Sequence, residues 1–176
     1  MEMTHYMELL ASNQPWNLIF YMAIPVILGE IVAITELFIL FKKRKDGVLG
    51  LLNKAAGISA GIYFSIIFLV LLNNVVIPLT INGQWRGLFD IVAVGFYMAG
   101  IIPLLGITIL ELGLIFKKSS FEQKLFRHGI LVALFLVVAH IAMIFGMLNP
   151  SLIQSKTNIE IKIQNSGHNN TMHMNM

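Results

Sequence analysis

The amino-acid sequence predicts an all-α integral membrane protein whose four transmembrane helices form an up-down bundle. Only 12% of the 176 residues are charged, whereas soluble domains carry about 25%, and the mean hydropathy is +0.79. Four apolar stretches are long enough to cross the roughly 30 Å of hydrocarbon as helices. Basic residues gather in two short loops between these stretches, a pattern typical of cytoplasmic loops.

The expected spans cover residues 16–41, 55–81, 88–116 and 129–148. The first is too long for a signal-peptide core and no basic region precedes it, so we treat it as part of the mature protein. Small residues in the stretch AAGISAG (55–61) indicate close packing of span two against a neighbour. Residues 1–15 form a Met/His-containing segment before this four-helix domain (16–150), and residues 151–176 form a polar tail that ends in a Met/His-rich segment.

The distribution of Lys and Arg predicts the orientation. Five lie in and after the first loop (42–54) and four lie in the third loop (117–128), against three elsewhere. Both loops are therefore expected in the cytoplasm and both termini outside it. A prokaryotic inner membrane, with the termini facing the outside or periplasm, is the expected location.

The two halves of the chain predict an internal repeat. Residues 13–81 contain NQPW, FYMAIPVILG and TELFILFKK, and residues 82–150 contain NGQW, FYMAGIIPLLG and LELGLIFKK in the same order. Pro25 aligns with Pro103, and Glu36 aligns with Glu111. Each half would form a hairpin of the same orientation, so we expect two parallel-repeat hairpins related by an axis along the membrane normal.

Ionisable side chains within spans are costly and need a physical reason. Glu36 and Glu111 lie near the predicted cytoplasmic ends. There they either reach the interface or pair with Lys and Arg, or they form an inner gate or proton site. Asp90 is expected to pair with Arg86 at i, i+4. His128 follows basic residues of the inner loop and is expected to be solvated or to contact lipid headgroups.

Two further side chains are predicted near the bilayer midplane. Glu30 in span one and His140 in span four have no counterpart in the other half. Polar residues on one copy only of a duplicated scaffold indicate a site. The alternative is a structural role, in which Glu30 hydrogen-bonds to His140 or each of them bonds to a serine, a threonine or a carbonyl.

Methionine and histidine are concentrated on the predicted outer side. The chain has no cysteine, so a metal site would use His, Met, carboxylate or backbone oxygen, and thioether with imidazole suits Cu(I). Positions i, i+3 and i+7 of span four share one helical face. The predicted Cu(I) ligands are His140, Met143 and Met147 on that face, Met22 and Met98 on other spans, Met3, His5 and Met7 near the N-terminus, and His168, Met172, His173, Met174 and Met176 in the tail.

In these short motifs the chain resembles the eukaryotic-type copper transporters, which combine Met-rich extracellular ends with a membrane MxxxM, here Met143 to Met147. It is also similar to bacterial membrane copper-resistance proteins that have intramembrane His and Met. The resemblance covers these motifs alone, and the number of spans differs from that of the transporters.

Three functions stay open. The first is copper handling, by inward transport of Cu(I) or by delivery to a copper enzyme or metallochaperone. The second is a b-type haem or quinone-linked electron-transfer subunit, with His140 as a haem b ligand. The third is a proton- or cation-coupled transporter, or an assembly subunit without metal, in which Glu30, Glu36 and Glu111 carry protons or cations.

The expected partner is the lipid bilayer, and the sequence leaves open whether the protein also forms a homo-oligomer. No nucleophile–base pair, phosphate-binding loop or carboxylate dyad indicates an enzyme. The clustering of basic residues in membrane loops also gives no reason to expect nucleic acid.

Overall fold

The computed structural model describes residues 3–43, 45, 47–115 and 120–149, and in these ranges every regular element is a helix. Four helical stretches in them are long and apolar enough to cross a membrane: Trp16–Lys42, Gly47–Ile81, Leu88–Glu111 and Phe121–Met147. These findings confirm the all-α class and the four expected spans, and identify an integral membrane protein by helix length and composition.

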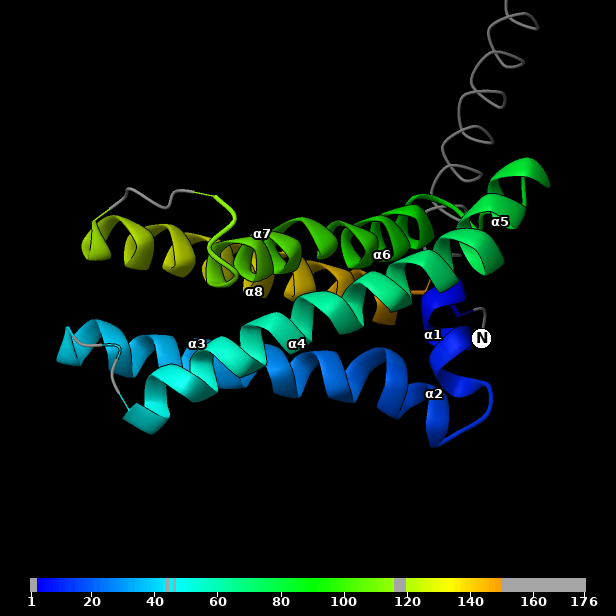
Figure 1. Cartoon of the computed structure of the whole chain (residues 1–176). Helices are drawn as coiled ribbons and strands as arrows, with labels where there is room; N and C mark the ends of the chain where they lie inside the picture. Colours follow the sequence, from blue (N-terminus) through cyan, green and yellow to red (C-terminus); the bar gives the residue numbers. More distant parts are fainter. Residues whose placement is uncertain (1–2, 44, 46, 116–119, 150–176) are drawn as a thin grey trace, which may run out of the picture.

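Each stretch is built from one or more elements (Figure 1). The short helix α1 (His5–Ala11) comes first. The first stretch then contains α2 (Trp16–Leu18), the π-helix η1 (Ile19–Ala23) and α3 (Ile24–Lys42), and the second contains α4 (Gly47–Leu71), the π-helix η2 (Leu72–Val76) and α5 (Ile77–Ile81). The third contains α6 (Leu88–Ala99) and α7 (Ile101–Glu111), and the fourth is α8 (Phe121–Met147).

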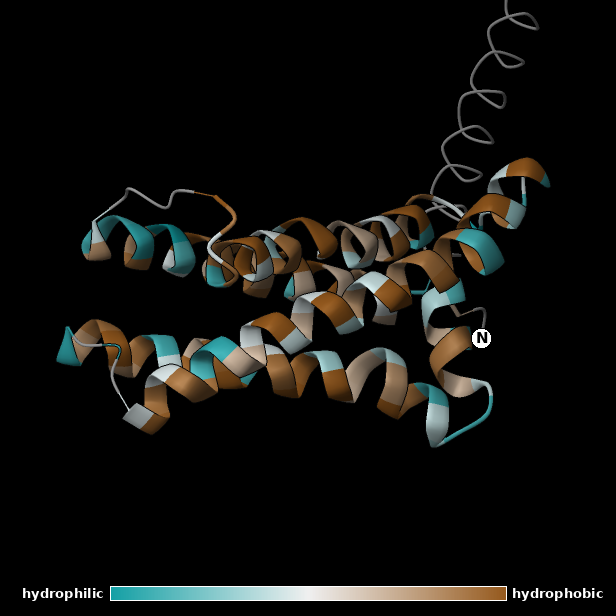
Figure 2. Ribbon diagram, in the orientation of Figure 1, coloured by the Kyte–Doolittle hydropathy of each residue, from teal (hydrophilic) through white to brown (hydrophobic). Residues whose placement is uncertain are grey.

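Successive stretches run in alternating directions and close into a bundle (Figure 1). Helix α3 packs on α4, α4 on α7, and α8 on α6, α7 and α3. We call the end that holds α1 the α1 end. The opposite end, where α3 finishes and α8 begins, is the basic end. Apolar residues dominate the helices between the two ends (Figure 2), and many large apolar side chains face outward, where lipid would lie.

Prolines mark the irregular turns of the spans. Pro25 follows η1 and Pro78 follows η2, as expected because proline has no N–H for the preceding turn. The carbonyl groups of Phe20 and Tyr21 lie one turn before Pro25. They accept hydrogen bonds from the hydroxyls of Tyr63 (3.0 Å) and Tyr97 (2.5 Å), so the break in span one is tied to α4 and α6.

The helix boundaries differ from the expected spans. The second stretch begins at Gly47 rather than at residue 55, and its 35 residues extend about 50 Å, which exceeds the hydrocarbon thickness. The fourth begins at Phe121, where Ser120 caps the helix by accepting from the Gln123 N–H at 3.3 Å. The third ends at Glu111, before Gly113 adopts a left-handed φ of 68°. Hydropathy measures the apolar section of a span, whereas capping residues set where the helix ends.

Candidate functional site

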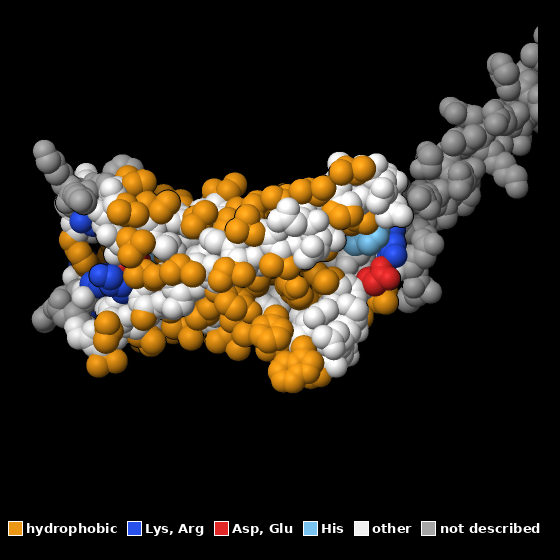
Figure 3. Space-filling view, turned by 45° about the vertical axis from the view of Figure 1, so that its right-hand side comes forward, with side chains coloured by type: hydrophobic (Ala, Val, Ile, Leu, Met, Phe, Trp, Pro, Cys, Tyr) orange, Lys and Arg blue, Asp and Glu red, His pale blue; other side chains and the backbone are white. Residues whose placement is uncertain are grey.

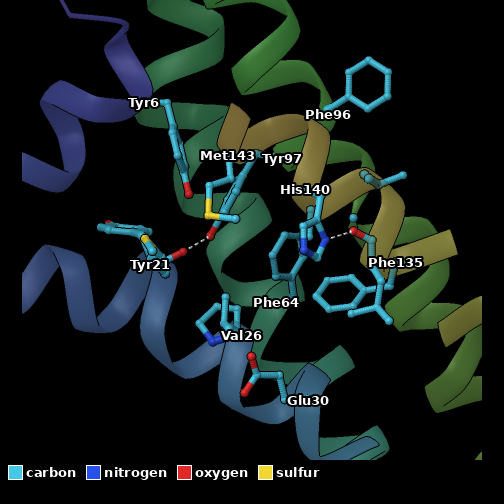
Figure 4. Close-up of a pocket in the computed structure, with 16 residues that line it drawn as sticks. Tyr6, Tyr21, Val26, Glu30, Phe64, Phe96, Tyr97, Phe135, His140 and Met143 are labelled. Atoms are coloured by element: carbon cyan, nitrogen blue, oxygen red, sulfur yellow. Dashed lines mark hydrogen bonds between the residues drawn. The ribbon is translucent and has the colours of Figure 1, made fainter. Parts of the chain in front are cut away.

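An apolar cavity of about 170 Å³ lies towards the α1 end. Its wall includes the aromatic rings of Tyr6 and Tyr97. Four side chains that bind metals or protons also line it: Met22, Glu30, His140 and Met143. Figure 4 shows Tyr6 and Glu30 towards opposite ends of the cavity, with His140 and Met143 between them. The fold thus brings predicted ligands of spans one and four to a single cavity.

The imidazole of His140 is held in one tautomer. Its Nδ1 lies 2.6 Å from the carbonyl oxygen of Leu136, the residue one turn earlier in α8. Because a carbonyl only accepts, Nδ1 carries the proton and the neutral ring keeps a lone pair on Nε2. Hydrogen bonds of this kind orient metal-binding histidines, so His140 is prepared to bind through Nε2.

Glu30 makes no hydrogen bond or ion pair with any residue that the structure describes. Of the structural alternatives that the sequence left open, the Glu30–His140 pair is therefore not formed, whereas the bond of His140 to a carbonyl is, through Leu136. Both side chains line the same cavity, where Glu30 offers an unpaired carboxylate.

Two other predicted intramembrane ligands lie away from this cavity. Met98 is buried in the bundle core, and Met147 is 63% exposed on the outside of α8. Beyond Met143, the inward face of α8 packs against α1 instead of lining the cavity. Tyr6 of α1 lies directly on Gly146, where an added Cβ would lie 2.7 Å from the Tyr6 ring. Only His140 and Met143 of the predicted triplet thus line the cavity.

Helix α1 is fixed to the bundle by the buried carboxylate of Asp90. This carboxylate accepts the backbone N–H of His5 at 2.7 Å and lies 2.6 Å from Nδ1 of the same histidine. Arg86 gives Asp90 only its backbone N–H, at 3.2 Å, while its guanidinium pairs with Glu8 at 2.6 Å. The expected side-chain pair of Asp90 with Arg86 is wrong, because α1 supplies two groups of His5 to the same carboxylate.

The N-terminal Met/His residues are consequently part of the fold. Thr4 donates to the Gly146 carbonyl at 2.7 Å, Met7 packs against the core, and Met3 is exposed. His5 is engaged with Asp90, so these residues do not form a free metal-binding segment. Burial raises the pKa of Tyr6 to about 12, which keeps its phenol neutral beside the cavity.

A second polar cluster lies at the basic end. His128 is 4% exposed, and its Nδ1 lies 2.9 Å from Glu36 while its Nε2 lies 3.2 Å from Glu111. Glu111 also pairs with Lys45, and Asn53 donates to Glu36 at 3.3 Å. The repeat-related glutamates therefore meet at one imidazole.

The expectation that His128 is solvated is wrong. His128 lies on the buried face of α8, in register with Val132, Phe135 and Ala142. Spacings of four, seven and fourteen residues place these side chains on one helical face. This spacing could have predicted from the sequence that His128 is buried. The basic residues beside His128 instead favoured a solvated position.

Among the described residues, no group of three or more His, Asp and Glu side chains is placed to hold a metal ion. This absence concerns His, Asp and Glu side chains and does not extend to methionine. The predicted tail ligands His168, Met172, His173, Met174 and Met176 lie outside the described residues.

Residues 1–162 match the model of the protein family described as "Family of unknown function (DUF6803)", and the chain belongs to that family. No curated protein and no solved structure matches the chain significantly.

Proposed function

We propose that the protein handles copper by binding Cu(I) in the cavity at the α1 end. The observation that carries the proposal is the convergence of Met22, His140 and Met143 on one cavity, with Nε2 of His140 left available by the bond of Nδ1 to Leu136. One imidazole and two thioethers form a soft ligand set that suits Cu(I). The Glu30 carboxylate in the same cavity can balance the charge of the ion.

The size of the cavity favours a single ion over haem. Drug-sized ligands occupy pockets of roughly 300 Å³ or more, whereas this cavity measures about 170 Å³. A porphyrin is larger than this volume, and His140 is the single histidine on its wall among the residues that the structure describes. The copper hypothesis therefore has more support than the b-type haem hypothesis.

In the proposed arrangement the α1 end faces the outside, as the loop charges predict. Ions captured at the C-terminal tail pass to the cavity, from which they are transported inward or delivered to a copper enzyme or metallochaperone. Single cysteines introduced at Asn82 and at Gln123, on opposite ends, test the orientation. An impermeant thiol reagent applied to intact cells should label only Asn82→Cys.

Competition with a chromophoric Cu(I) chelator, on full-length protein in detergent under reducing conditions, tests the site. A chain ending at residue 150 removes the tail ligands and isolates the cavity. This shortened chain should bind one Cu(I), and His140→Gln or Met143→Leu should weaken binding at least about tenfold, since even outer-shell changes cost 10–100-fold. X-ray absorption should show sulfur scatterers around the metal.

Met147→Leu is the matched control, because it removes a thioether from the same helix outside the cavity. The isosteric change is tolerated by packing, and copper binding should stay unchanged. Equal affinity in the His140, Met143 and Met147 variants would rule the cavity out as the copper site.

A second function, proton or cation coupling, draws support from the polar cluster at the basic end. Glu36 Oε1 and Asn53 Oδ1 are buried acceptors without a hydrogen-bond partner among the described residues, and buried acceptors of this kind gain from a proton or cation. Vesicles loaded with a pH-sensitive dye, under an imposed potential, test this function. Proton entry should exceed that of protein-free vesicles and fall in Glu36→Gln, and equal rates would contradict it.

A further inference from the structure

A second cavity, of about 520 Å³, opens at the basic end between α4, α7 and α8. Its wall includes three lysines from separate parts of the chain: Lys45 before α4, Lys54 within α4 and Lys124 within α8. His128 lies at the same cavity. Figure 3 shows that charged side chains gather at the ends of the molecule and that hydrophobic side chains are spread over the surface between them.

The three lysines are not equivalent. Lys45 pairs with Glu111, whereas the ammonium groups of Lys54 and Lys124 have no partner among the described residues. Lys54 lies seven residues into α4, about 10 Å along the helix axis. A long basic side chain at that depth extends towards the interface, and in this structure it borders the cavity.

The charges around the cavity add to a small positive excess. Glu36 and Glu111 supply two negative charges, and both already contact His128. The three lysines supply three positive charges, so the wall carries a net charge of about +1 before any proton on His128 is counted. A single anionic group is needed to neutralise it, and a phosphodiester carries one negative charge.

The remaining wall is apolar. Leu51, Leu110, Phe121 and Leu125 line the cavity beside the lysines. A wall that carries both basic and apolar side chains matches an amphiphile better than a free ion. Basic pockets between transmembrane helices are known to hold acidic headgroups.

We propose that this cavity binds the phosphodiester headgroup of an anionic phospholipid, held by Lys54 and Lys124, with the acyl chains along Leu51 and Leu125. Such a lipid would join α4 to α8 at the end where the two glutamates and His128 meet.

Native mass spectrometry of the full-length protein in detergent, with dioleoyl phosphatidylglycerol or dioleoyl phosphatidylcholine added, tests the proposal. One phosphatidylglycerol should stay bound at collision energies that remove phosphatidylcholine. The double variant Lys54→Gln/Lys124→Gln should weaken retention at least tenfold. Lys42→Gln/Lys43→Gln is the control, because it removes the same charge from the same end but outside the cavity wall, and it should behave as wild type.

Circular dichroism and size-exclusion chromatography establish that each variant folds, and Lys54→Arg and Lys124→Arg provide charge-preserving variants that should retain the lipid. Equal loss in the two double variants would mean general attraction of acidic lipid to the basic end and would overturn the site. A thermal-shift experiment with inorganic phosphate, at constant ionic strength, tests whether the cavity binds free phosphate rather than a lipid headgroup. Stabilisation by phosphate alone, lost with Lys54 and Lys124, would overturn the lipid assignment. The copper assays use neither lysine, so the two proposals can fail separately.

Discussion

The close approach of α4 and α7 at Gly61 gives the sharpest test of the packing. A Cβ at this position would overlap the Oγ1 of Thr108 and lie 2.7 Å from the Leu104 carbonyl oxygen. Ordinary contact begins near 3.4 Å, so in Gly61→Ala the backbone carbonyl must retreat by about 0.7 Å. Thr108 cannot simply rotate away, because its hydroxyl also bonds the carbonyls of Gly57 (3.2 Å) and Leu104 (3.1 Å).

Overpacking of this kind costs about 1–3 kcal/mol, and the loss of one hydrogen bond adds about 1 kcal/mol. The better helix propensity of alanine returns up to about 1 kcal/mol. The expected net loss is about 2 kcal/mol, or a fall in Tm of about 4–8 °C for a chain of this size.

Thermal unfolding in dodecyl maltoside, followed by near-UV circular dichroism, measures the effect. Gly95→Ala is the matched control, since a Cβ there has no neighbour within 4 Å and the propensity change is the same. A Tm for Gly61→Ala that equals the Tm for Gly95→Ala would refute the close packing of α4 on α7.

Three further predictions concern polar groups. Because burial raises the pKa of Tyr6 to about 12, the unfolded chain loses this proton near pH 10 and the folded chain later. The free energy of unfolding should therefore fall by up to about 3 kcal/mol as the pH rises from 10 to 12. Chemical unfolding measured across that range should show a smaller fall in the free energy of unfolding for Tyr6→Phe. His128→Ala leaves two carboxylates around an empty site and should destabilise the protein by about 3 kcal/mol. Chemical unfolding in mixed micelles measures this loss, and a loss below about 1 kcal/mol would mean that water replaces the imidazole. Tyr97→Phe orphans the Tyr21 carbonyl beside Pro25 and should cost about 1–3 kcal/mol. The amide infrared band of the Tyr21 carbonyl should shift on substitution, and an unchanged band would contradict the hydrogen bond.

The sequence predicted the parts of the fold that hydropathy controls. Four spans were recognisable because apolar runs of sufficient length rarely form anything except membrane helices. The start of the second span was misplaced because Lys54 interrupts the apolar run, whereas the helix continues back to Gly47. The arrangement into parallel-repeat hairpins and the location of the termini outside the cytoplasm stay predictions.

The candidate site was partly predictable for a different reason. His140 and Met143 share a face of α8, and the helical period alone related them. Met22 was predicted as a further ligand because it lies in the outer part of span one, but the sequence could not distinguish it from Met98, since only the packing of the spans brings Met22 to the cavity. The sequence related Glu36 to Glu111 by alignment, but their meeting at His128 required the tertiary structure.

The polar contacts that hold the N-terminal segment and α1 to Arg86 and Asp90, here called the clasp, bear on how the protein should be produced. Arg86 donates to the carbonyl of Met3 at 2.6 Å, and the carboxylate of Asp90 lies against the backbone N–H of His5. A fusion partner attached ahead of Met1 would lie only a few residues along the chain from both bonds. An oligohistidine tag at either end would add copper ligands of its own. A cleavable C-terminal tag without histidine therefore leaves both the clasp and the metal assay undisturbed.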